Sequence, residues 1–153
     1  MQINNFPKYF SIQTTSVCNA SCVFCPYDEI KNMFPHKVMT MDLYKNIIDE
    51  CSGHDNVERI ILYMNNEPLT DPQIIERINY AKERVPWASV HLLTNGSMLT
   101  DRIADELLGS ALDWIGISFH GIRKETVEKS MGIPFAATLK RINKFIANWA
   151  IFC

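Results

Sequence analysis

The sequence predicts an α/β protein built on a parallel sheet, and three observations support this prediction. β-prone runs alternate along the chain with stretches of helical period, a helix is expected after every strand, and polar segments follow the strand ends. The 153 residues, with 47% apolar and 21% charged side chains, are typical of one globular domain, 1–153. The formal net charge of −2 provides no basic surface, so a nucleic-acid partner is not expected.

The first half of the chain contains two expected strands. Residues 9–14 are β-prone and lead into a segment of about residues 15–39 that carries three cysteines, which we call the cysteine loop. Thr40 is a plausible N-cap for a helix, because apolar residues recur after it at helical spacing before a glycine, at Leu43, Ile47, Ile48, Cys51 and Gly53. Residues 57–64 predict a buried strand.

The second half contains two more expected strands. Asp71 and Pro72 predict a helix start, with Asp71 as the cap and Pro72 where its missing N–H costs little. Strands are expected over residues 89–93 and 114–119, with a helix over residues 100–109 between them. After a break, a last helical stripe contains Leu139, Ile142, Ile146 and Trp149.

Polar segments follow all four expected strands. Because such an arrangement predicts parallel strands, their carboxyl ends lie at one rim of the sheet, where α/β proteins bind ligands. The segments concerned are the cysteine loop and residues 65–68, 94–96 and 118–121. The sequence therefore predicts one site at this rim.

Three of the five cysteines lie within eight residues, at Cys18, Cys22 and Cys25. The N-terminus has no readable export signal, and no apolar run approaches the roughly 20 residues of a membrane span, so a cytoplasmic protein without a membrane partner is expected. In a reducing compartment, closely spaced thiols indicate a metal site more often than disulfides.

A metal site with three thiolates keeps one coordination position for an exogenous ligand, whereas a closed zinc site or an ordinary iron-sulfur cluster uses four protein ligands. Two alternatives stay open. The three thiols could belong to a zinc site completed by Cys51 or His36, or they could be unrelated core residues.

The spacing of Cys18, Cys22 and Cys25, with Phe24 before the last cysteine, resembles the CxxxCxxC signature of the radical S-adenosylmethionine (radical SAM) superfamily. This resemblance implies that the three cysteines hold a 4Fe-4S cluster, and that S-adenosylmethionine chelates the fourth iron. It also implies a partial (β/α) barrel, of whose usual six βα units about four are present here. Residues 1–153 are then expected to be a radical SAM core domain that is incomplete at its C-terminus.

The segment Asn65, Asn66, Glu67 and Pro68 stands where the family carries its glycine-glycine-glutamate-proline motif. By this resemblance, the backbone carbonyls and Glu67 bind the ammonium group of S-adenosylmethionine. A carboxylate suits a cation in a partly dry site. Asn in place of Gly is tolerable because Asn also visits left-handed backbone conformations.

Two later segments extend the resemblance. The turn over residues 94–96, with Asn95 at its centre, is similar to the family's T-N-G turn, which shapes the site. Ser118 and His120 match positions that contact the ribose hydroxyls or the carboxylate of S-adenosylmethionine. For His120, an acid or base role toward the substrate and a merely structural role are alternatives.

The resemblance implies an oxidoreductase-like radical enzyme. S-adenosylmethionine would be cleaved reductively to a 5′-deoxyadenosyl radical that abstracts hydrogen from a peptide or small-metabolite substrate, with flavodoxin or ferredoxin as the reductant. Because an open parallel edge invites association, a partner or a second copy is expected over it. The alternative is a non-catalytic iron-sulfur or zinc-binding remnant or scaffold that needs a partner.

Overall fold

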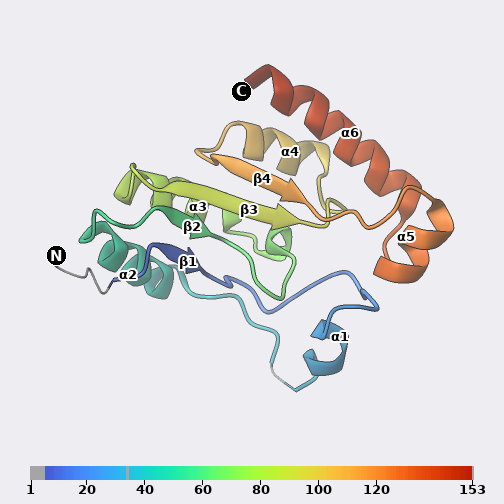
Figure 1. The fold of residues 1–153 in the computed structure, drawn as a ribbon, viewed down its shortest axis with the longest axis horizontal. Helices are drawn as coiled ribbons and strands as arrows, with labels where there is room; N and C mark the ends of the chain where they lie inside the picture. The colour runs from blue at the N-terminus through green and yellow to red at the C-terminus, as the bar shows by residue number, and fades with distance from the viewer. Residues whose placement is uncertain (1–5, 34, 153) are drawn as a thin grey trace.

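One open sheet of four parallel strands forms the centre of the protein (Figure 1). The computed structural model describes residues 6–33 and 35–152. The strands lie side by side in chain order, as β1 (Tyr9–Ser11), β2 (Arg59–Ile61), β3 (Ser89–Thr94) and β4 (Trp114–Ile117). Every pairing is parallel, which confirms the predicted α/β class and places all four strand ends at one rim.

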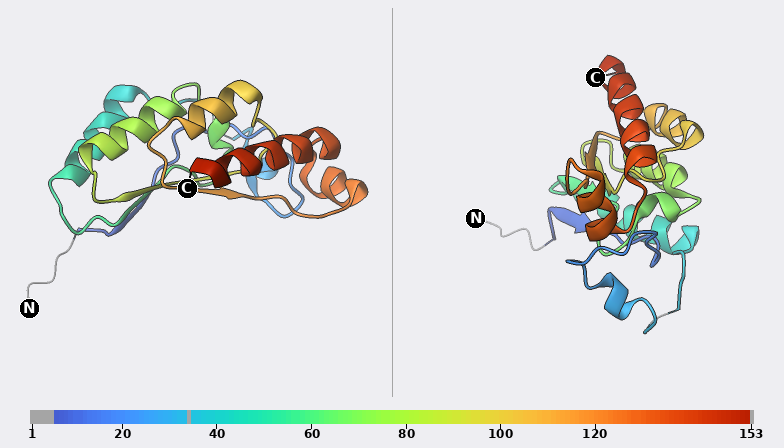
Figure 2. Two further views of the ribbon diagram at one scale, coloured as in Figure 1. Left: turned by 90° about the horizontal axis from the view of Figure 1, so that it is seen from above. Right: turned by 90° about the vertical axis from the view of Figure 1, so that its right-hand side faces the viewer.

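Helices α2, α3 and α4 cover one face of the sheet (Figure 2). The helices are α1 (Tyr27–Ile30), α2 (Met41–Ser52), the 3-10 helix η1 (Pro68–Thr70), α3 (Ile74–Arg84), α4 (Asp101–Leu108), α5 (Lys124–Met131) and α6 (Phe135–Phe152). Helix α6 packs against α4 and α5. Within the described part of the chain, no helix combines the length and apolar character that crossing a membrane requires.

The core lies between the sheet and these helices. Alternate residues of β3, Val90, Leu92 and Thr94, are buried, and Ile60 of β2 lies beside Val90 in register. From the helices, Cys51 packs into this core as a small apolar residue, 1% exposed. Each fully buried aliphatic side chain contributes about 1.5–3 kcal/mol to folding, so this layer fixes the sheet that carries the rim.

Two helices were predicted correctly, and a threonine caps the start of each. The Thr40 hydroxyl accepts from the backbone N–H of Leu43 at the start of α2, and Thr100 accepts from Ile103 at the start of α4. Helix α2 ends directly before Gly53, as expected, and α4 ends before Gly109, one residue earlier than predicted. A side-chain acceptor at the N-cap is a short-range feature, so the sequence alone reveals it.

The predicted start of α3 is wrong by two residues. The helix begins at Ile74, and residues 72–73 form a turn before it. One Asp71 oxygen accepts from Gln73 N at 2.9 Å, but the other accepts from Nε of the buried Arg77 at 2.8 Å. Asp71 is therefore half of a buried ion pair, which a cap pattern does not reveal.

Strands β1, β2 and β4 are shorter than predicted. They end at residues 11, 61 and 117, respectively. Ile12 N still donates to Ile61 O at 2.8 Å, but beyond it the chain bonds to the far end of the cysteine loop, where Met39 N donates to Thr14 O at 2.7 Å. Helices α1 and α5 were not predicted. In α5 the only buried residues are Val127 and Met131, too few for a clear apolar stripe.

Candidate functional site

An open cavity lies at the rim, where the segments after the four strands meet. It is lined by ten of the eleven residues that the sequence singled out, namely Cys18, Cys22, Phe24, Cys25, Asn65, Asn66, Glu67, Asn95, Ser118 and His120. Pro68, the eleventh, is buried in η1 behind Glu67. Residues up to 102 positions apart in the chain therefore share one concave surface, as α/β proteins use for ligands.

The thiols of Cys18, Cys22 and Cys25 are partly exposed at this cavity. The backbone N–H of Cys18 donates to the Tyr27 hydroxyl at 2.9 Å, and the N–H of Cys25 donates to the carbonyl of Cys22 at 3.0 Å. Tyr27, in α1, is itself buried. A buried tyrosine thus holds the backbone of the first cysteine, while a tight turn joins the other two.

Helix α5 fixes the middle of the cysteine loop from the other side. Ser21 N donates to Met131 O at 3.0 Å, and Val23 N donates to Ser130 O at 2.9 Å. Gly132 follows α5 with a left-handed φ of 67°, which L side chains rarely adopt. A small apolar cluster of Ala20, Val127, Met131 and Ile133 lies beneath these bonds.

Burial raises the pKa of the Cys18 thiol to about 11, and it also raises the pKa of Cys22. The neighbouring Cys25 thiol adds to the shift at both residues. A thiol with a raised pKa stays protonated near neutral pH, so a cationic group is needed to hold these sulfurs as thiolates.

The donor set fits an iron-sulfur cluster. Three sulfur ligands share one cavity, and thiolates are the ligands of such clusters. Among the described residues, no three His, Cys, Asp or Glu side chains already surround a single point, but a cluster distributes its thiolates over different irons. The zinc alternative that Cys51 would complete loses its fourth sulfur, because Cys51 of α2 is 1% exposed and packs into the core, whereas the form that His36 would complete stays an alternative.

Glu67 is a buried carboxylate, 2% exposed, with three donors around it. Its Oε1 accepts from Leu69 N at 3.1 Å and from Thr94 Oγ1 at 2.6 Å, and its Oε2 accepts from Asn95 N at 2.8 Å. Burial raises the pKa of Glu67, while the hydrogen bonds oppose that shift. Glu67 lines the cavity, and its Oε2, which accepts only the hydrogen bond from Asn95 N among these three, has acceptor capacity left for a cation.

Asn65 and Asn66 do not adopt the left-handed conformation that the comparison with glycine suggested. Among the described residues, only glycines have positive φ. Asn65 N donates to Gln13 Oε1 at 3.2 Å, and Asn66 Oδ1 accepts from Met64 N at 2.9 Å. The side chain of Asn66 therefore stabilises its own turn, which is a common role of asparagine in loops.

The Asn95 side chain joins the third rim segment to the cysteine loop. Its Nδ2 donates to Asn19 Oδ1 at 2.9 Å, and its Oδ1 accepts from the N–H and the hydroxyl of Ser97. Gly96 has a φ of 77°, and a Cβ there would lie 2.7 Å from the Ile142 side chain. The T-N-G turn thus requires its glycine, and its asparagine holds the loop that carries Cys18.

Ser118 and His120 complete the rim after β4. Ser118 N donates to Thr94 O at 2.8 Å, which extends the pairing of β4 with β3 into the site. The ring of His120 lies edge-on to Phe24, with centroids 4.7 Å apart, and the backbone N–H of His120 donates to the Met131 sulfur at 3.3 Å. Both side chains line the cavity, as the sequence suggested.

Several lining residues were not predicted, notably Tyr27, Tyr63, Met64, Leu93 and Met131. Tyr63 and Met64 directly precede the 65–68 segment, and Tyr27 follows Cys25 by two residues, so proximity along the chain could have indicated them. Met131 offers no such signal, because it reaches the site through the unpredicted helix α5.

The comparisons with known proteins agree on one family. A family model described as the Radical SAM superfamily matches residues 12–149. The AdoMet-dependent heme synthase of Methanosarcina barkeri is 29% identical over 134 residues, 88% of this chain and 37% of that protein. The GTP 3',8-cyclase of Chlorobaculum tepidum is 30% identical over 119 residues, 76% of this chain and 34% of that protein. The chain thus spans about a third of the length of these curated relatives.

Solved structures show the same fold. Streptococcus suis SuiB bound to S-adenosylmethionine matches with a TM-score of 0.75 at 17% identity, over 94% of this chain and 32% of that chain. BtrN in complex with AdoMet and 2-DOIA matches with a TM-score of 0.65 at 22% identity, over 90% of this chain and 56% of that chain.

Proposed function

Because the chain belongs to the radical SAM superfamily, we propose that it binds a 4Fe-4S cluster and S-adenosylmethionine in the rim cavity and acts as a radical enzyme. One observation carries the proposal: Cys18, Cys22 and Cys25 of the cysteine loop and Glu67 of the segment after β2 line a single cavity. The chemistry that these groups supply when bound is reductive cleavage of the sulfonium to methionine and a 5′-deoxyadenosyl radical, which abstracts hydrogen from the substrate.

The protein's part is to bind, orient and exclude water. Cys18, Cys22 and Cys25 would hold the cluster, and Phe24 would shield it beside His120. Glu67 would bind the ammonium group of S-adenosylmethionine, since its carboxylate is already fixed by three donors and has acceptor capacity left. A charge fixed before binding needs little reorganisation when the cation arrives.

The remaining rim residues would position the rest of S-adenosylmethionine. Asn65 and Asn66 would present backbone carbonyls beside Glu67, and Ser118 and His120 would contact the ribose or the carboxylate. Asn95 would act mainly through the shape of the turn, because both ends of its amide are already hydrogen-bonded to protein groups.

A peptide or a small metabolite is the proposed substrate class. The names of the relatives support both kinds: heme synthase and GTP 3',8-cyclase act on small molecules, and SuiB has been solved bound to a precursor peptide. A flavodoxin or ferredoxin is the proposed reductant, since the cleavage consumes one electron. We also propose that a partner or a second copy covers the free edge of β4, which is the last strand of the sheet.

Anaerobic reconstitution tests the cluster. We expect about four irons per chain in the unmodified protein and in Cys51→Ala, whose thiol lies in the core, but a large loss in Cys22→Ala. The two variants form a matched pair, because each removes one sulfur. Equal iron loss in both variants would contradict the assignment of the ligands.

S-adenosylmethionine tests the enzyme. The EPR spectrum of the dithionite-reduced protein should change when S-adenosylmethionine is added, and methionine and 5′-deoxyadenosine should appear with time. A protein that prefers zinc, or a cluster signal indifferent to S-adenosylmethionine, would favour the non-catalytic scaffold.

For the β4 edge, light scattering is the measurement, and a stable monodisperse monomer would argue against a second copy.

A further inference from the structure

The two ends of the cysteine loop pair with each other before the loop departs from the fold. Met39 N donates to Thr14 O at 2.7 Å, Ser16 N donates to Lys37 O at 2.9 Å, and an antiparallel bridge joins Thr15 to Val38. We call this short ladder, residues 14–16 with 37–39, the neck. The three cysteines lie in the sequence between these two segments, so the neck sets where their loop begins and ends.

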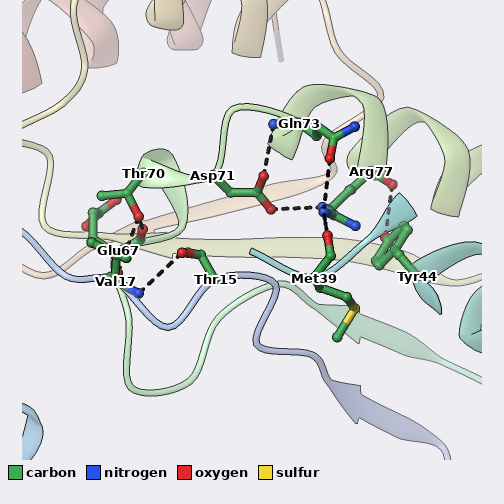
Figure 3. A network of polar contacts seen from close by, with 9 residues as sticks. All are labelled: Thr15, Val17, Met39, Tyr44, Glu67, Thr70, Asp71, Gln73 and Arg77. Atoms are coloured by element: carbon green, nitrogen blue, oxygen red, sulfur yellow. Dashed lines mark hydrogen bonds and ion pairs between the residues drawn. The ribbon is translucent and has the colours of Figure 1, made fainter. Parts of the chain in front are cut away.

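A buried guanidinium ties the neck to helix α3 (Figure 3). Arg77 is 0% exposed, and its Nη2 donates to the carbonyl of Met39. Its Nε donates at 2.8 Å to Asp71, whose side chain is also fully buried. The planar fork of arginine can bind a carboxylate and a carbonyl at the same time, which a lysine ammonium does less well.

Tyr44 of α2 completes the support of Arg77. Its ring centroid lies 5.0 Å from the guanidinium carbon, and its hydroxyl donates to the backbone carbonyl of Arg77 at 2.9 Å. Nη1 of Arg77 has no hydrogen-bond partner within the described residues, and the Tyr44 ring is a further stabilising contact of the cation.

The same segment of chain, residues 67–77, also holds the other end of the loop. Glu67 N donates to Val17 O at 3.0 Å, and the Thr70 hydroxyl, whose shorter bond is to Glu67 O at 2.8 Å, lies 3.3 Å from the Val17 carbonyl oxygen (Figure 3). Val17 directly precedes Cys18. Residues 67–77 therefore contact the entry and the exit of the cysteine loop, and Glu67 lines the cavity from the same segment.

We propose that Arg77, through Asp71 and Met39, is a positioning residue that fixes the neck and thereby the placement of the three cysteines relative to Glu67. Stability alone does not account for such a network, because a buried ion pair stabilises a fold little more than apolar residues of the same volume would. The polar groups specify one geometry instead. The effect of Arg77 on the cluster rests on the proposed function, whereas the geometry of the neck is independent of it.

Arg77→Lys tests the neck, with Leu107→Ala as the control. Lysine keeps the charge and loses the fork, while Leu107, buried in α4, takes no part in the network. In cluster-free protein, amide hydrogen exchange at Ser16 and Met39 should accelerate at least tenfold more than exchange in β3 for Arg77→Lys. In Leu107→Ala, the neck and β3 should accelerate together, because that variant lowers global stability only.

The second measurement is the EPR spectrum of reconstituted, reduced protein with and without S-adenosylmethionine. Arg77→Lys should alter the response to S-adenosylmethionine, and Leu107→Ala should keep the unmodified response. The proposal would be overturned if, in Arg77→Lys, amide exchange in the neck accelerated no more than exchange in β3. It would also be overturned if exchange in the neck accelerated selectively while the EPR response to S-adenosylmethionine stayed unchanged. If the unmodified protein takes up no cluster, the proposed function fails, and the exchange data alone decide whether Arg77 holds the neck.

Discussion

Thr94→Val removes one hydroxyl from the buried surroundings of Glu67. The Thr94 hydroxyl donates to Glu67 Oε1 at 2.6 Å and accepts from Gly96 N at 3.1 Å. Valine fills nearly the same volume, but it leaves the carboxylate with one donor fewer and the Gly96 N–H without its acceptor. A hydrogen bond to a charged group contributes about 1.5–3 kcal/mol, and an unsatisfied buried N–H costs about 1–3 kcal/mol. Together the two contributions predict a loss of about 2.5–6 kcal/mol near neutral pH.

The loss should depend on pH in a known direction. Burial raises the pKa of Glu67 above its usual value, and the Thr94 hydroxyl opposes this by stabilising the ionised form. In the unmodified protein, the stability linked to this raised pKa is full at acid pH and is lost as pH rises through the folded-state pKa. Thr94→Val raises that pKa further, so its deficit is smaller at acid pH, where the cost of the unpaired Gly96 N–H remains, and grows as Glu67 ionises.

Urea unfolding of the cluster-free protein between pH 5 and pH 8 measures both effects. Thr138→Val is the matched control, because Thr138 is 1% exposed and its hydroxyl has no hydrogen-bond partner among the described residues. It should change stability by less than about 0.5 kcal/mol, or increase it, at every pH. Equal losses in the two variants, or a Thr94→Val deficit that shrinks as pH rises, would refute the reasoning.

Two further substitutions probe the support of the cysteine loop. Gly132→Ala should cost about 1–2 kcal/mol by thermal unfolding, because φ is 67° and the new Cβ would lie 3.3 Å from Ser21 Cβ, whereas Gly109→Ala, at φ −85° with ordinary contacts, should cost nothing. A similar cost at both glycines would contradict this. Tyr27→Phe should cost about 1–3 kcal/mol by urea unfolding and speed exchange of the Cys18 amide, whose acceptor it removes, while unchanged exchange would count against that bond.

The parts of the fold that the sequence predicted depend on contacts between near neighbours. Thr40 and Thr100 cap helices through backbone groups three residues away, and Gly53 and Gly109 follow the helix ends. The order of strands and helices also follows from short-range periodicity, and parallel pairing then brings four loops to one rim. For this reason the sequence alone predicts that these four segments meet at one site.

The errors arise where distant residues decide. The pattern Asp71 and Pro72 has the composition of a helix start, but Arg77 draws the Asp71 carboxylate into a buried pair, and the helix begins later. Likewise, Asn65 and Asn66 suggested left-handed backbone by analogy with glycine, whereas extended or right-handed backbone suffices there. In the first case a tertiary contact, and in the second the path of the backbone, overrides the conformation that the isolated segment favours.

The site itself separates into chemistry that side chains identify and geometry that backbone atoms provide. Cysteine and glutamate are recognisable because few other residues can ligate iron or bind an ammonium group. The cysteine loop, however, is held by carbonyls of Val17, Met39 and Met131, and a backbone carbonyl is the same in every residue type. Only a side chain that donates a hydrogen bond to such a carbonyl can be recognised from the sequence, and Arg77 is one of these. Residues that fix a metal-binding loop should therefore be sought among buried donors in the neighbouring elements, outside the motif itself.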